Sequence, residues 1–439
     1  MEKQPLLEPR PSKGERYTLV IHGGAGTMSK QGSTSEQQAA YKAALTAALE
    51  VGYNILREGG EAMDAVVAAV TSMEDNPLFN SGKGAVFNVD GKNELEASIM
   101  LSKPPASHPD IPLSRRGLGL TLLTRARNPS QLVRALYLAP SLVPHTFLSG
   151  ATAEAIGAGL GAELVAPSYF FTEHRWKEHR RGLGLPEEPL PATIIQRDLK
   201  DIPPLDQLPT GTVGAVALDV RGCIAALTST GGRTNKLVGR IGDTPSMGSG
   251  FWAEEWLTKR GHILSWPREI LNKVFRRKHQ PSAIGVSGTG DGDYFIRLAS
   301  AVTIARRVRY LHEPLEKAAQ AAVNDLLVEG GIGGIIALDD MGNVAMPLNC
   351  PGMYRGVIRE DGVPKTAIFD DDLLDCTFNP LSSSGVAFMS VTLSRQVRNF
   401  GLDCPCRTKY KRMMITDTLP SFEEKIQYPL LTPDLDIIK

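Results

Sequence analysis

The sequence is poor in cysteine and contains no long hydrophobic run. Its five cysteines are scattered over 439 residues, too sparse for the disulfide framework of a small secreted protein. No uninterrupted apolar stretch approaches the roughly 18 residues that a membrane-spanning helix needs. The polar first residues also lack the apolar segment of a secretory signal. These absences predict a soluble protein of the cytoplasm with no membrane partner.

Excess charge and the common catalytic motifs are missing as well. Lys plus Arg and Asp plus Glu number 48 each, so no charge excess favours a nucleic-acid partner. Cys404 and Cys406 lack the second pair or the histidines that a zinc site needs. The motifs HExxH and GxSxG and the Walker loop are absent too. We therefore expect no metal and no cofactor, and polar residues in glycine-rich loops are the candidates for chemistry.

The chain alternates short strands with paired helices. We expect a disordered lead-in over residues 1–16 and one domain over 17–372. Within that domain, the charged and proline-rich segment 168–211 indicates a linker, and the basic segment 252–280 indicates an amphipathic helical insertion. The pattern then dissolves into a poorly ordered tail over 373–439. Two hairpins with helix pairs between them favour a layered sandwich over a parallel Rossmann sheet.

A β-hairpin directly follows the expected linker. Its strands are Val213–Leu218 and Cys223–Leu227, joined by a short turn. Ser, Thr and Gly flank it, which fits either a site or an ordinary hairpin with polar ends. Thr212 opens the first strand, and a threonine hydroxyl inside a chain is a weak nucleophile. Cleavage of the bond after Gly211 would give Thr212 a free α-amine with a pKa of about 8, and so a base beside its own hydroxyl.

Three other loops have polar residues that fit more than one role. His22, in a strand-to-glycine turn, could be a base, a ligand or a hydrogen-bonded structural histidine. Arg240 and Asp243 are three residues apart and could simply pair with each other. The loop 288–292 resembles a nucleotide-binding loop but lacks the Lys-Ser/Thr that would accompany it. The residues alone leave these alternatives open.

Motifs outside the hairpin, taken with it, narrow the choice. In chain order they are HGGAG at 22–26, GGEAMDAV at 59–66, FNSGKGAVFN at 79–88, ASIM at 97–100, GTGDGD at 288–293 and GNVAMPLNCPGMYRG at 342–356. Together with the hairpin, the chain resembles the plant-type asparaginases, or isoaspartyl aminopeptidases, of the N-terminal-nucleophile hydrolases. The resemblance covers roughly residues 17–372. It implies an α+β fold, the four-layer αββα sandwich, and a dimer of αβ units. It also implies a precursor that cleaves itself into an α chain, 1–211, and a β chain, 212–439.

The resemblance also implies roles for the hairpin and the loop after it. Thr212, which follows Gly211, matches the self-cleavage point and the nucleophile. Thr230 matches the threonine whose hydroxyl supports that nucleophile. Arg240 matches the arginine that grips the substrate α-carboxylate, a role suited to a forked guanidinium. Asp243 matches the acceptor of the substrate α-ammonium.

The remaining matched residues complete the expected site. Thr289 and Gly290 match the loop that holds the scissile amide and the amino group, and Asn80 matches a donor that helps Thr289 form the oxyanion hole. The resemblance therefore implies a threonine hydrolase for a small-molecule substrate. Its expected reaction is cleavage of the side-chain amide of L-asparagine or of isoaspartyl peptides, which releases aspartate.

The chain departs from the family pattern at several places, and other functions stay open. Glu96 stands where the family usually has aspartate, and residues 101–105 replace its usual Asp-Gly. A threonine endopeptidase or a glycosylasparaginase could use the same scaffold, although the missing secretory signal argues against the latter. A catalytically silent homologue could instead act as a binding protein through the basic insertion.

Overall fold

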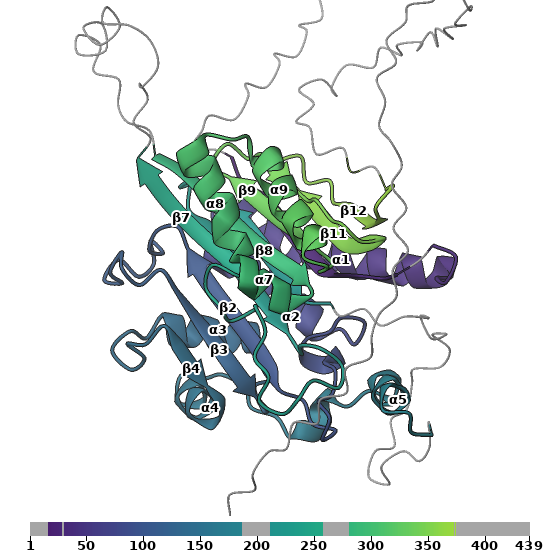
Figure 1. The fold of residues 1–439 in the computed structure, drawn as a ribbon. Coiled ribbons are helices and arrows are strands. Elements are labelled where there is room, and N and C mark those ends of the chain that lie inside the picture. Colours follow the sequence, from purple (N-terminus) through teal and green to yellow (C-terminus); the bar gives the residue numbers. More distant parts are fainter. Residues whose placement is uncertain (1–15, 29, 187–210, 258–280, 373, 375–439) are drawn as a thin grey trace, which may run out of the picture. The chain divides into compact units, whose positions relative to one another are not determined.

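The computed structural model describes most of the chain up to residue 374. The described residues are 16–28, 30–186, 211–257, 281–372 and 374. All of them belong to one compact unit, Met1–Phe378. Helices and strands are mixed along this unit (Figure 1), which confirms the predicted α+β class. Among the described residues, no helix is long and apolar enough to cross a membrane.

The larger of two sheets has the predicted hairpin at its centre. Its strand order is β12 (Lys365–Phe369), β11 (Gly352–Ile358), β1 (Thr18–Gly26), β5 (Val213–Leu218), β6 (Ile224–Thr230), β2 (Leu95–Leu101), β3 (Gly117–Leu123) and β4 (Phe147–Ser149). Neighbours pair antiparallel except β3 and β4, which are parallel. The β5–β6 turn is held by Asp219, whose carboxylate accepts the backbone N–H groups of Arg221 and Cys223. This contact confirms the tight turn that the sequence predicts.

The smaller sheet packs against the centre of the larger one. Its antiparallel order is β10 (Val344–Ala345), β9 (Gly333–Asp339), β8 (Pro281–Gly290) and β7 (Phe251–Leu257). Strands β5 and β6 lie against β8. A buried cluster that includes Val216, Ile224, Phe251 and Ile336 fills the space between the two sheets. Because side chains alternate along a strand, every second residue of β5 and β8 points into this layer.

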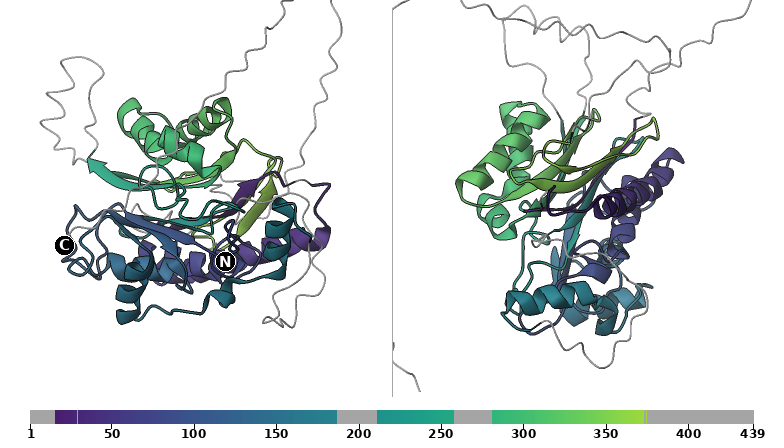
Figure 2. Two further views of the ribbon diagram at one scale, coloured as in Figure 1. Left: turned by 60° about the horizontal axis from the view of Figure 1, so that its bottom comes forward. Right: turned by 90° about the vertical axis from the view of Figure 1, so that its right-hand side faces the viewer.

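Helices cover the outer face of each sheet (Figure 2). Those on the larger sheet are α1 (Ser35–Arg57), α2 (Ala62–Glu74), α3 (Pro129–Tyr137) and α4 (Gly150–Gly159). Those on the smaller sheet are α8 (Ser300–Leu311) and α9 (Leu315–Val328), and α7 (Gly292–Leu298) follows β8 in the chain. Each helix layer closes its own hydrophobic cluster. One apolar layer thus lies between the two sheets, and one lies between each sheet and its helices.

One part of the expected linker is an ordered helix instead. Of the segment 168–211, residues 187–210 lie outside the described residues, but α5 (Glu173–Gly182) precedes them. Thr172 caps α5 by accepting the N–H of Arg175. Arg175 is buried, pairs with Glu178 at 2.8 Å and donates to a backbone carbonyl at 2.9 Å. Some of the charged residues that suggested a solvated linker therefore form a buried ion pair within α5. Composition alone does not show which charged residues pair in this way.

The beginning of the expected helical insertion is a strand. Residues 258–280 lie outside the described residues, but 252–257 belong to β7, which pairs with β8. The alternation of β7 explains the difference: Ala253 joins the cluster between the sheets, and Trp256 packs beside α8. A two-residue alternation so short is easily taken for one turn of an amphipathic helix.

Candidate active site

Thr212 and Thr230 face the same layer between the two sheets. Val213 belongs to the helix-covered core, so Thr212, one residue earlier, points toward the smaller sheet. The β5–β6 register pairs Val213 with Ser229, and its continuation by one residue places Thr212 opposite Thr230. Directly opposed residues have Cβ atoms about 4.5–5.5 Å apart. Thr230 accepts the N–H of Gly232 at 2.9 Å, which leaves its own hydroxyl hydrogen to donate toward Thr212.

Thr289, on β8 of the smaller sheet, contacts the backbone of Thr212. Its buried Oγ1 accepts the N–H of Thr212 at 3.1 Å and the N–H of Ala25 at 3.2 Å. These two donors occupy the hydroxyl lone pairs, so the hydroxyl hydrogen remains to donate to a third group. The next residue, Gly290, has φ 138°, and a Cβ there would lie 2.4 Å from the Cα of Gly333. Only glycine fits this close approach.

His22 is a hydrogen-bonded histidine under the Thr212 backbone. Its Nδ1 lies 2.8 Å from the carbonyl oxygen of Thr212 and its Nε2 lies 2.8 Å from Ser287 Oγ. Burial lowers the pKa of His22 to about 4, so the ring is neutral near pH 7. Since a carbonyl only accepts, Nδ1 has the hydrogen and Nε2 accepts from Ser287, which is also 2.8 Å from Thr228 Oγ1. This geometry supports the structural alternative for His22.

Arg240 and Asp243 lie in one loop but make different contacts. Arg240 Nη2 pairs with Asp293 Oδ1 at 3.2 Å, at the start of α7. Within the described part of the chain, Arg240 therefore forms its ion pair with Asp293 and not with Asp243. Asp243 is buried, and burial, with the like charge of Glu96, raises its pKa to about 7. A Cβ at Gly292 would lie 2.3 Å from Asp243 Oδ1, so the absence of a side chain there makes room for the carboxylate.

Asn80 is tied to the turn that follows Thr230. Its Nδ2 donates to the carbonyl of Gly232 at 2.7 Å, and its Oδ1 accepts the N–H of Val86 at 3.0 Å. One hydrogen of the amide therefore remains for another acceptor. That Asn80 shares an oxyanion hole with Thr289 stays a prediction.

Two residues outside the expected site belong to its surroundings. Asp293, which pairs with Arg240, is the last residue of the GTGDGD motif, so this motif could have identified it as part of the site. Glu96 is fully buried, pairs in register with Thr230, and accepts the N–H of Gly242 at 2.9 Å. The alternation of apolar residues around Glu96 predicts its direction, but its partner comes from a loop far along the chain.

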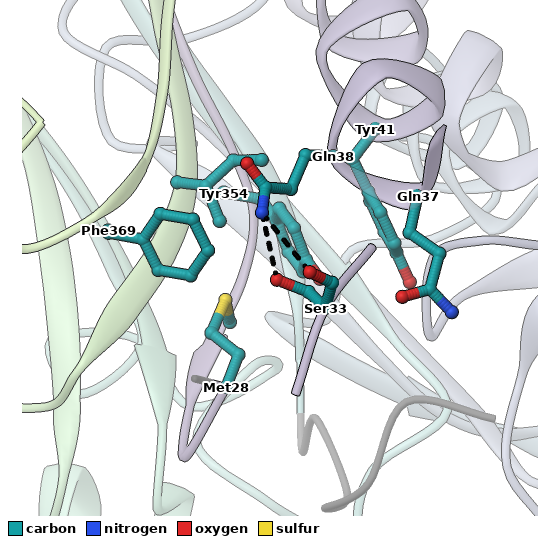
Figure 3. Close-up of a pocket in the computed structure, with 8 residues that line it drawn as sticks. Met28, Ser33, Gln37, Gln38, Tyr41, Tyr354 and Phe369 are labelled. Atoms are coloured by element: carbon teal, nitrogen blue, oxygen red, sulfur yellow. Dashed lines mark hydrogen bonds between the residues drawn. The ribbon is translucent and has the colours of Figure 1, made fainter. Parts of the chain in front are cut away.

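A small cavity lies on the other side of the larger sheet (Figure 3). Its volume is about 10 Å³, enough for about one water molecule, and its lining residues come mainly from α1, β11 and β12. They are Met28, Ser33, Gln37, Gln38, Tyr41, Tyr354, Ile368 and Phe369. Because Tyr354 belongs to the helix-covered core, this cavity opens away from the layer of Thr212. It is too small for an amino acid. The described residues also contain no cluster of three or more His, Cys, Asp or Glu that could hold a metal ion.

Comparison with known proteins finds similarity over most of the described chain. The family described as asparaginase matches residues 15–258 and 280–368. The isoaspartyl peptidase of Escherichia coli K12 is 36% identical over 355 residues, which cover 81% of this chain and 96% of that protein. The putative isoaspartyl peptidase/L-asparaginase of Dictyostelium discoideum is 34% identical, over 79% of this chain and 94% of that protein. The isoaspartyl peptidase/L-asparaginase of Homo sapiens is 37% identical over 54% of this chain and 67% of its own length.

Proposed function

Because the chain belongs to the asparaginase family, we propose that it is an asparaginase and β-aspartyl peptidase with Thr212 as its N-terminal nucleophile. The observation that carries this proposal is the β5–β6 register, whose continuation by one residue sets Thr212 opposite Thr230, together with the hydrogen bond from the Thr212 N–H to Thr289 Oγ1. The names of the relatives support the substrates: L-asparagine and isoaspartyl peptides. Both present an amide on the side-chain carbonyl of an aspartyl group.

Self-cleavage between Gly211 and Thr212 is the first step of the proposed mechanism. It frees the α-amine of Thr212, whose pKa of about 8 suits a base at neutral pH. This amine takes the proton of the Thr212 hydroxyl as Oγ attacks the substrate β-carbonyl carbon. The carbonyl becomes an oxyanion, which accepts a hydrogen bond from the spare hydroxyl hydrogen of Thr289 and from Asn80.

Collapse of the tetrahedral intermediate completes the first half of the reaction. The carbon–nitrogen bond breaks, and the protonated amine of Thr212 returns its proton to the leaving ammonia or peptide amine. An aspartyl ester on Thr212 Oγ remains. Water, deprotonated by the same amine, attacks the ester carbonyl and releases L-aspartate, and the hydroxyl regains its proton. Thr230 donates to Oγ and lowers the cost of its charge during attack.

The loop around Arg240 and Asp243 is proposed to bind the α-amino-acid end of the substrate. The guanidinium of Arg240 suits a forked contact with the α-carboxylate, and Asp293 holds one of its nitrogens. Asp243 accepts the α-ammonium and becomes fully ionised when that cation binds, because an adjacent positive charge lowers its pKa. Gly290 brings its backbone close to the scissile amide.

We further propose that the fold is the four-layer αββα sandwich of the N-terminal-nucleophile hydrolases. The order of helix layer, sheet, sheet and helix layer supports it. In this proposal the α chain is 1–211 and the β chain is 212–439, within one hydrolase domain, and two αβ units form a dimer. The family match stops at residue 258 and resumes at 280, which supports an inserted segment between these points.

A denaturing gel of the purified protein, with substrate assays, tests this function. The wild type should give two bands, with Thr212 as a new N-terminus, and should release aspartate from asparagine or β-aspartyl-leucine. Thr212→Ala should give one band and no turnover, whereas Thr212→Ser, which keeps a hydroxyl, should still process. N-glycosyl-asparagine and an ordinary α-linked peptide distinguish a glycosylasparaginase and an endopeptidase. One stable wild-type band would favour a silent homologue, and an active Ala variant would refute the nucleophile.

A further inference from the structure

Glu96 lies in the same row of side chains as the two threonines of the site. In the β2–β6 register Glu96 is directly opposite Thr230, and the β5–β6 register, continued by one residue, sets Thr230 opposite Thr212. Its neighbours Leu95 and Ala97 belong to the helix-covered core, so Glu96 points into the layer between the sheets. Adjacent strands are about 4.8 Å apart, which places the backbone of Glu96 roughly 10 Å from that of Thr212. A buried carboxylate thus shares the layer of the nucleophile.

The two oxygens of this carboxylate have different surroundings. Glu96 has no exposed surface, and its Oε1 accepts the N–H of Gly242 at 2.9 Å. Its Oε2 is buried and has no hydrogen-bond partner among the described residues. A Cβ at Gly242 would lie 3.2 Å from Oε2 and 2.7 Å from Arg240 Nη1. The carboxylate therefore holds Gly242, one of the two residues between the proposed substrate-binding groups Arg240 and Asp243, and lies beside Arg240.

The charges around Glu96 and Asp243 do not balance. The groups that face these two carboxylates are Glu94, Lys236, Arg240 and Asp293, and Arg233 lies 4.0 Å from Asp293. Lys236 is buried and donates to the carbonyl oxygen of Glu94 at 2.6 Å. The four carboxylates of Glu94, Glu96, Asp243 and Asp293 therefore lie near three cations, Lys236, Arg240 and the more exposed Arg233. Burial raises the pKa of both Glu96 and Asp243. One further cation at this place would relieve the imbalance.

We propose that Glu96 is a positioning residue for the α-amino-acid end of the substrate: it fixes Gly242, directs Arg240 and Asp243, and adds a second negative charge behind the ammonium site. This inference rests on the proposed function. The length of the side chain matters, because aspartate is shorter by one methylene and its oxygens would stop about 1.5 Å further from the Gly242 nitrogen. Glu96 acts through the loop that contains Arg240, Gly242 and Asp243, and Thr212 remains the nucleophile.

Two variants separate the hydrogen bond from the charge. Glu96→Ala leaves the buried N–H of Gly242 without an acceptor, so KM should rise about tenfold to a hundredfold while kcat changes about twofold. Glu96→Gln keeps an acceptor for Gly242 and removes the charge. Asp243 then loses a like charge and its pKa falls. The break that Asp243 contributes to the acid limb of kcat/KM, which lies below the break of the Thr212 amine, should therefore move about one unit toward lower pH. Self-cleavage should continue in both, because Thr212 and Thr230 are unchanged.

Glu154→Gln is the matched control. Glu154 is equally buried, on α4, and its carboxylate accepts the N–H groups of Thr124, Arg125 and Ala126. This variant should lower the melting temperature without a change in KM or in the acid limb. A purely structural role for Glu96 would give the same result as this control, because only a positioning role connects it to substrate affinity.

The outcomes decide between these roles. A wild-type KM in Glu96→Ala with an unmoved acid limb in Glu96→Gln would overturn the proposal. If the Ala variant does not fold, the acid limb of the Gln variant decides alone. The dissociation constant of L-aspartate, measured by calorimetry in each variant over the same pH range, needs no turnover. If the wild type releases no aspartate from either substrate, the proposed function fails, and this binding series still decides the role of Glu96.

Discussion

Replacement of Thr289 by valine tests the proposed oxyanion hole. Valine keeps the shape of threonine but removes the hydroxyl that accepts from Thr212 and Ala25 and that would donate to the oxyanion. One lost oxyanion donor raises the barrier by about 3–4 kcal/mol, so kcat should fall about 10²- to 10³-fold. Each buried N–H left without an acceptor also costs about 1–3 kcal/mol of stability. We therefore expect a slower and less stable enzyme whose KM changes little.

The assay is steady-state release of aspartate, with processing scored on the same preparations by denaturing gel. Thr289→Ser keeps the hydroxyl and should retain kcat within about tenfold of the wild type. Thr71→Val is the control, because the Thr71 hydroxyl contacts Ser130 Oγ at 2.8 Å on the helix-covered side and should not affect kcat. A Thr289→Val enzyme that processes and keeps kcat within about threefold of the wild type would refute the oxyanion role.

Three further variants test the substrate loop and the buried histidine. Arg240→Lys should raise KM at least about tenfold with little change in kcat, since lysine cannot form a forked contact; unchanged affinity would remove Arg240 from this role. Asp293→Asn should raise KM less, because its partly exposed ion pair only orients Arg240; an effect as large as that of Arg240→Lys would assign Asp293 a direct contact. The pKa of His22 is about 4, below its unfolded value of 6.5, so the unfolded chain binds the extra proton. The free energy of unfolding should therefore fall as pH falls from about 6.5 to 4, by up to about 1.4 kcal/mol per unit, and denaturant titrations should show a shallower fall in His22→Gln; equal slopes would contradict this.

Burial is the common cause of the unusual proton affinities at this site. It keeps His22 neutral near pH 7, with its Nδ1–H donated to the Thr212 carbonyl and its Nε2 accepting from Ser287, so that neither nitrogen is available as a base. It also keeps Asp243 near its titration point at neutral pH. In the proposed mechanism, no side chain is the general base, which leaves that role to the amine of Thr212.

The local elements were predictable because they depend on neighbours in the chain. The β5–β6 hairpin follows from two apolar runs and a turn at Asp219, and it forms as expected. The errors came from charge and short alternation. The residues of α5 looked solvated, but Arg175 and Glu178 form a buried pair. The start of β7 looked helical because only strand pairing with β8 identifies it.

The sequence by itself determined the family, the hairpin and the candidate nucleophile Thr212 at its start, because motif identity and two-residue periodicity are local properties. Only the tertiary structure decided which residues these side chains contact. The row from Thr212 through Thr230 to Glu96, and the contact of Arg240 with Asp293, depend on register and loop placement. These contacts join residues far apart in the chain, and periodicity states which face a side chain occupies but not what it meets there.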